Sequence, residues 1–346
     1  MKKIISLVAF FFLLPSLVSA WGPITHQNIN DQFLNALSSQ SGNYIIQEIT
    51  ANRGVFDSCY MVTDATVIHY YFEHSKYDAT HGQSFADCVA GKDSNSVKLR
   101  VCSYGIYAHL LADSVSHQSF VPSRIRATNL PNWIIHPISE GIVETHIWDR
   151  TPISYERAKD SLQTYYNDPQ LQQVLQSCYS PDGSINLKTD VDTLSDALGN
   201  PQGFYTKLFG LPGIYQGVAF GDLQSGIVAL MIGIILLIIL IKVENPIRYV
   251  TIPFIILFFI GAYIFLGGGL KSMTSNVNAD YWIQQTVDRL TTTFQPSNWS
   301  QRYQYDPTGD SWLAQADAET FPIWGTVIGL VMVIITIFIY KWWKDK

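Results

Sequence analysis

Charged residues are scarce in this chain of 346 residues: only 14% are Asp, Glu, Lys or Arg, while 47% are hydrophobic. A soluble domain of ordinary composition carries about 25% charged residues. The shortage excludes a disordered chain, a coiled coil and a nucleic-acid-binding tail, and it argues against a wholly soluble protein. The formal net charge of −6 also gives no general electrostatic reason to bind polyanions.

Cysteines are also few. The chain has four, and no two of them have the CxxC spacing, so a cysteine-based zinc site is not expected. An even number of cysteines in one segment predicts up to two disulfides in an oxidising compartment, with three possible pairings. The four are Cys59, Cys88, Cys102 and Cys178.

The hydrophobic surplus is concentrated in four runs. At the amino terminus, Lys2 and Lys3 precede an apolar run from Ile4 to Leu14 and small residues up to Ala20. This pattern predicts a secretory signal peptide, residues 1–20, cleaved after Ala20; the alternative is an uncleaved anchor. A transmembrane helix needs roughly 20 apolar residues. Three runs near that length follow, at 223–243, 249–270 and 322–340.

Positive residues predict the orientation of these spans. The link between the first two spans carries Lys242 and Arg248, and the tail 341–346 carries three lysines, so both belong on the cytoplasmic side. The segments 21–222 and 271–321 are then exoplasmic, which makes a multi-pass membrane protein with three spans. The second segment contains the sequon Asn298-Trp299-Ser300, a candidate glycosylation site on that side.

Residues 21–222 are long enough to form a core of their own, and their pattern is helical. Strand-type alternation is absent from the sequence, and the stretch 179–203 is rich in loop-forming residues, with room for a short helix. The expected fold class is an all-α domain followed by three transmembrane helices. Apolar residues recur at spacings of three and four in Asn28–Leu37, Ser96–Ser116, Ile134–Trp148 and Tyr155–Tyr166.

Histidines are confined to one part of the chain: all eight lie between His26 and His146. His109, Asp113 and His117 have the spacing i, i+4, i+8, which places them on one face of a helix. Two imidazoles and a carboxylate suit zinc, and the central carboxylate can bridge two ions. The alternative is a polar stripe on a core helix.

Two further elements fit the same chemistry. His136 and Glu140 repeat the i, i+4 spacing on a second predicted helix, where Pro137 fits the first turn. The third element is Trp21 followed by His26 at the expected mature terminus. Cleavage after Ala20 frees the α-amine of Trp21, which can chelate a metal together with its own carbonyl oxygen.

These three elements resemble the zinc-dependent phospholipase C family, which shares its fold and trinuclear site with glycosylphosphatidylinositol-specific phospholipase D and single-strand-specific zinc nucleases. The resemblance covers about residues 21–150. The segment His109–Phe120 is more similar to the phospholipases, whereas the gap between Trp21 and His26 is similar to that of the nucleases. The resemblance implies three zinc ions held by Trp21, His26, Asp64, His81, His109, Asp113, His117, His136 and Glu140.

Two of these ligands have rivals. Asp64, in Val-Thr-Asp, is similar to the family's small-residue-Pro-Asp element, with Thr63 in place of the proline. His81, in Thr-His-Gly-Gln-Ser-Phe, resembles a stretch of the phospholipase D branch, although His69 fits the shorter Asp-to-His gaps elsewhere in the family. The alternatives are Asp57 for the aspartate, and His69 or His74 for the histidine.

The resemblance implies hydrolysis of a phosphodiester by a metal-activated water, with Asp64 orienting that water or accepting its proton. Glu144 and His146 are expected to be solvated or to support the ligands. The segment 21–222 has 12 Lys plus Arg against 20 Asp plus Glu, which argues against a nucleic-acid substrate. Attachment to a bilayer instead favours phospholipid headgroups. The alternatives are a zinc nuclease or nucleotidase, and a non-catalytic membrane protein with a structural metal domain.

Overall fold

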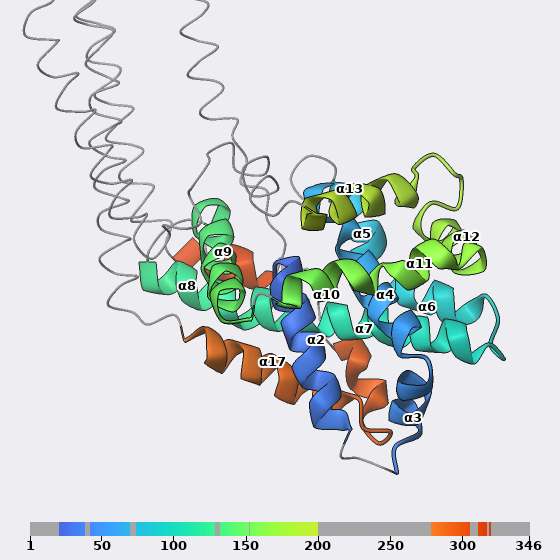
Figure 1. Cartoon of the computed structure of the whole chain (residues 1–346). Helices are drawn as coiled ribbons and strands as arrows, with labels where there is room; N and C mark the ends of the chain where they lie inside the picture. The colour runs from blue at the N-terminus through green and yellow to red at the C-terminus, as the bar shows by residue number, and fades with distance from the viewer. Residues whose placement is uncertain are drawn as a thin grey trace, which may run out of the picture.

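The computed structural model of the chain describes residues 21–38, 42–69, 74–128, 132–151, 153–199, 278–304, 311–316 and 318–319. Every regular element in these residues is a helix, which confirms an all-α fold for this part of the protein (Figure 1). The predicted signal peptide and the three predicted spans lie outside the described residues. Among the described residues, no helix is both long enough and apolar enough to cross a bilayer.

Three of the predicted helices are observed, as α2 (Pro23–Leu37), α7 (Val97–Val115) and α9 (Asn132–Arg150). The ends of α7 and α9 differ from the prediction by one or two residues, whereas α2 begins five residues earlier than predicted. The fourth, predicted over Tyr155–Tyr166, is two helices, because the chain turns at the buried residue Leu162. The remaining described elements are α3 (Tyr44–Ala51), α4 (Arg53–Thr63), η1 (Asp64–His69), α5 (His74–His81), α6 (Gln83–Gly91), η2 (Ser116–Phe120), α8 (Val121–Thr128), α10 (Ile153–Ser161), α11 (Gln163–Asn167), α12 (Pro169–Tyr179), α13 (Leu187–Gly199), α17 (Ala279–Thr293) and η3 (Trp299–Gln304).

The helix α13 corrects the expectation of loops and a short helix over 179–203, because it runs for 13 residues. Its buried leucines and valine recur at spacings of three and four, which is the pattern of an amphipathic helix. The loop-forming residues before it had obscured that pattern. The buried apolar positions are Leu187, Val191, Leu194 and Leu198.

The helix α7 is the centre of the fold, with every side chain from Val101 to Val115 buried. It crosses α4 in close contact at Gly105, where an added Cβ atom would lie 2.4 Å from the carbonyl oxygen of Phe56. A disulfide between Cys59 and Cys102 joins the same two helices.

A second disulfide joins Cys88 of α6 to Cys178 of α12. The prediction of two disulfides is therefore confirmed, and the structure selects one of the three possible pairings.

The segment predicted as the loop 271–321 contributes a helix to the same core. In Figure 1, α17 lies along α2, although more than 200 residues separate them in the chain. Phe294 at the end of α17 is fully buried and meets the ring of Phe33 at a centroid distance of 5.0 Å. Its carbonyl oxygen accepts a hydrogen bond of 2.9 Å from the Asn43 side chain. The core therefore contains residues that precede the first two predicted spans in the sequence and residues that follow them.

Candidate metal centre

The described residues contain three groups of buried histidines and carboxylates, and within each group the ligand atoms lie within 4.8 Å of one another. The first group joins α2 to α7 through His26, His109 and Asp113. The Nε2 atom of His26 lies 3.0 Å from Oδ1 of Asp113, and Nε2 of His109 lies 3.3 Å from Oδ2. The Tyr60 hydroxyl lies 3.1 Å from Nδ1 of His26 and fixes the orientation of that ring.

The second group contains Asp64, His81 and, again, His109. Asp64 follows directly after α4, and His81 is the last residue of α5. The Thr80 hydroxyl donates to the carbonyl oxygen of Thr63 at 3.1 Å and lies 3.0 Å from Nδ1 of His81. This contact orients the His81 ring, with its Nδ1 atom toward Thr80.

The third group contains His117, His136 and Glu140. Nε2 of His136 lies 2.8 Å from Oε1 of Glu140, as the i, i+4 spacing on α9 predicts. His117 lies in η2, a single π-helical turn that continues α7, so it does not simply extend the face of His109 and Asp113. Such turns displace the side chains that follow them and are frequent at functional sites. His117 joins the α9 ligands instead.

Trp21 lies beside these groups. Its side chain is fully buried, its indole N–H donates to the carbonyl oxygen of Ala112 at 3.0 Å, and its ring stacks on Phe120 at 4.9 Å. Trp21 therefore packs against the turn of α7 that carries Asp113.

Burial and neighbouring charges shift the pKa values of the carboxylates in these groups. Burial raises the pKa of Asp64 well above its usual value, and the charges of Asp113 and Glu144 add to this effect. Burial and Asp113 do the same to Glu140. Asp113 differs: burial alone would raise its pKa, but His109 and His26 hold it well below its ordinary range.

The pKa values of His109 and His136 change in the opposite sense, and both are lowered. Burial, followed by the charge of His26, lowers the pKa of His109 to about 4. Both carboxylate oxygens of Asp64 lack a hydrogen-bond partner within the described part of the chain. A buried carboxylate without partners is costly unless a cation compensates it. Nitrogen and oxygen donors in this arrangement can hold metal ions.

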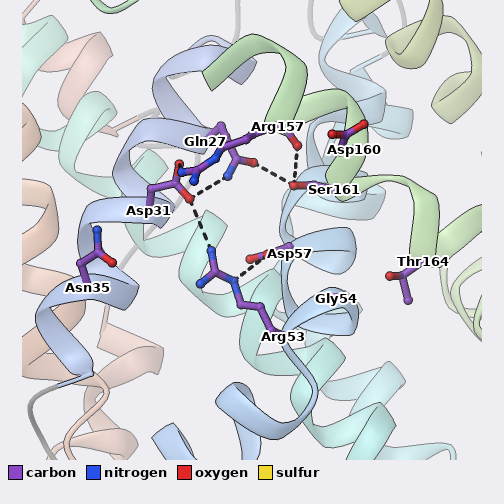
Figure 2. Close-up of a pocket in the computed structure, with 10 residues that line it drawn as sticks. All are labelled: Gln27, Asp31, Asn35, Arg53, Gly54, Asp57, Arg157, Asp160, Ser161 and Thr164. Atoms are coloured by element: carbon purple, nitrogen blue, oxygen red, sulfur yellow. Dashed lines mark hydrogen bonds and ion pairs between the residues drawn. The ribbon is translucent and has the colours of Figure 1, made fainter. Parts of the chain in front are cut away.

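The alternative aspartate, Asp57, belongs to none of the three groups found in the described residues. Figure 2 shows it in a polar cleft between α2, α4 and α10, where its carboxylate accepts a hydrogen bond of 2.6 Å from Arg53. Asn30 donates to its other oxygen at 2.8 Å. The side chains of the two alternative histidines, His69 and His74, lie outside the described part of the structure.

Glu144 and His146, which follow Glu140 on α9, were expected to be solvated or to support the ligands. Glu144 is not solvated: it is 1% exposed, and its carboxylate accepts backbone N–H bonds from Ile24 and Thr25. The i+4 spacing from Glu140 was the only signal for this position. His146 is partly exposed and meets Asp280 of α17 at 3.0 Å.

Comparison with family models, curated proteins and solved structures finds no match for this chain.

Proposed function

We propose that the protein is an exoplasmic, membrane-anchored, zinc-dependent phosphodiesterase of the phospholipase C type. The observation that carries the proposal is the set of three buried groups of histidines and carboxylates, two of which share His109. Every histidine and carboxylate in these groups was expected from the resemblance. A structural role rarely calls for so many buried ionisable side chains with so few hydrogen bonds.

Zinc is the metal that these donors favour. Imidazole nitrogens and carboxylate oxygens are its usual ligands in catalytic sites. Asp113 directs one oxygen toward His26 and the other toward His109 and His81, which is the arrangement of a bridging carboxylate. With Trp21 packed against Ala112, the residue before Asp113, these residues suit three ions.

The chain's own residues then have separate tasks in hydrolysis. When bound, zinc supplies positive charge that polarises phosphodiester oxygens and makes water more acidic. Among the residues that the structure describes, the carboxylate oxygens of Asp64 have no hydrogen-bond partner, and these would orient the attacking water and receive its proton. Thr80 and Tyr60 hold the rings of His81 and His26 in place.

The shared core supports the expected topology. Residues before 200 and after 277 pack together, which is compatible with two membrane spans between them in the sequence. The two disulfides suit an oxidising compartment. A tethered site encounters phospholipid headgroups at high effective concentration, and the net acidic segment disfavours nucleic acid.

The test uses the full chain, purified in detergent with Trp21 as its first residue, because α17 belongs to the core. Phosphorylcholine release from phosphatidylcholine vesicles and cleavage of single-stranded DNA are measured side by side. The proposal expects headgroup release that is lost in His109→Ala and in a protein with one residue added before Trp21. Cleavage of DNA alone would favour the nuclease, and a metal-loaded but inactive protein would favour a structural metal domain.

A further inference from the structure

The side chain of Glu144 joins α9 to the first turn of α2. Its Oε1 atom accepts from the backbone N–H of Ile24 at 2.8 Å, and Oε2 accepts from that of Thr25 at 2.9 Å. The Thr25 hydroxyl adds a third bond of 2.5 Å to Oε2. The first N–H groups of a helix have no partner within the helix, so Glu144 caps α2 from a position 120 residues away.

The helix has no cap of its own. Its N-cap residue is Gly22, which offers no side-chain hydrogen bond, and Pro23 follows it. The negative carboxylate also meets the positive end of the helix dipole. Glu144 therefore supplies both the hydrogen bonds and the charge that the start of α2 lacks.

The glycine at position 22 leaves room for the Glu144 carboxylate. A Cβ atom there would lie 2.4 Å from Cδ of Glu144 and 2.6 Å from each of its oxygens. The backbone thus approaches the carboxylate more closely than any other residue type allows.

The contact lies between two of the metal groups. On α9, Glu144 follows Glu140 by four residues and so shares its face of the helix. On α2, the capped turn ends at His26, a member of the first group, and begins one residue after Trp21.

We infer that Glu144 is a positioning residue that clamps the amino-terminal segment to α9, so that Trp21 and His26 reach the ligands on α7. The inference rests on the proposed metal function of these ligands. Glu144 itself is engaged with backbone N–H groups and is assigned no ligand role.

The test compares Glu144→Gln with wild type in the full chain that begins at Trp21. An amide has one acceptor oxygen, and its NH₂ group would face a backbone donor, so one bond is lost. Hydrogen exchange of the Ile24 and Thr25 amides, measured on metal-free protein, should accelerate about tenfold to a hundredfold. Zinc content after loading should fall, with loss from the His26 group and retention at His117, His136 and Glu140.

Two controls separate positioning from general stability. Glu156→Gln makes the same change at an exposed site on α10 and should alter neither readout. Phe294→Ala weakens the core at Phe33, nine residues along α2 from Ile24, and should lower stability without lowering the zinc content of the folded protein. If Glu144→Gln behaves like Phe294→Ala, the positioning role is wrong and Glu144 is only structural.

Each of the remaining outcomes also supports or contradicts the positioning role of Glu144. Unchanged exchange and full zinc content in Glu144→Gln would overturn the inference. If that variant does not fold, Thr25→Val, which removes only the hydroxyl bond, should show a smaller change of the same kind in both readouts. Wild-type protein that binds no zinc would refute the proposed function, while exchange in the metal-free protein would still test the clamp.

Discussion

Asp113 lies with one carboxylate oxygen 3.0 Å from Nε2 of His26 and the other 3.3 Å from Nε2 of His109. The first helix of the domain is therefore joined to its central helix at the metal groups themselves. His81 approaches the second oxygen at 3.5 Å. A single carboxylate thus faces three imidazoles that come from three different helices.

This arrangement predicts that the Asp113→Asn protein binds less zinc than the Glu140→Gln protein. Asp113 faces ligands of both the first and the second group, whereas Glu140 belongs only to the third. Elemental analysis of the two purified variants, loaded identically, provides the measurement. Equal losses from the two variants would mean that Asp113 does not bridge.

The two candidate aspartates should respond differently to the same change. Asp64→Asn should lose zinc and activity, because Asp64 is fully buried within the second group. Asp57→Asn should keep both, because Asp57 pairs with Arg53 and Asn30 in the cleft of Figure 2. Loss of zinc from Asp57→Asn, with retention in Asp64→Asn, would reverse the assignment.

The role of α17 in the core can be measured by truncating Phe294. Removal of a fully buried phenylalanine side chain costs about 3–5 kcal/mol, through lost burial and the cavity left behind. Denaturant unfolding of Phe294→Ala should show a loss of this size. Tyr281→Ala, at a residue of α17 that is 49% exposed, should change stability little. A negligible effect at Phe294 would place α17 outside the core.

An ion pair away from the metal groups should make stability depend on pH. Two hydrogen bonds from Arg100 to Glu48, of 2.6 and 3.0 Å, lower the pKa of Glu48 below the ordinary value of 4.5. A lowered pKa stabilises the fold above the unfolded-state value, and that stabilisation disappears as pH falls through the folded-state value. Glu48→Gln should therefore cost about 1 kcal/mol at neutral pH and nothing in strong acid. A cost that does not vary with pH would contradict the pairing.

Local spacing explains why part of the site could be predicted. A helix places residues four apart on one face, so the pairs His109–Asp113 and His136–Glu140 were visible in the sequence. The i+8 relation of His117 was less reliable, because the π-helical turn that contains it changes the register after α7. Sequence spacing describes a helix only while its period is constant.

Long-range contacts could not be predicted in the same way. No local pattern pairs Glu144 with Thr25, or α17 with α2, because such contacts depend on how whole helices pack. The disulfide pairing has the same origin: four cysteines allow three pairings, and only the crossing of α4 with α7 brings Cys59 to Cys102. The capping role of Glu144 was missed because a carboxylate next to metal ligands is easily assigned to solvent or support.

The most direct test of the account is the zinc content of the full chain with Trp21 at its amino terminus, measured by elemental analysis after removal of loosely bound metal. Three groups of buried donors, two of which share His109, predict about three zinc ions per chain. A content of one ion or none would contradict the trinuclear site and, with it, the proposed hydrolytic function.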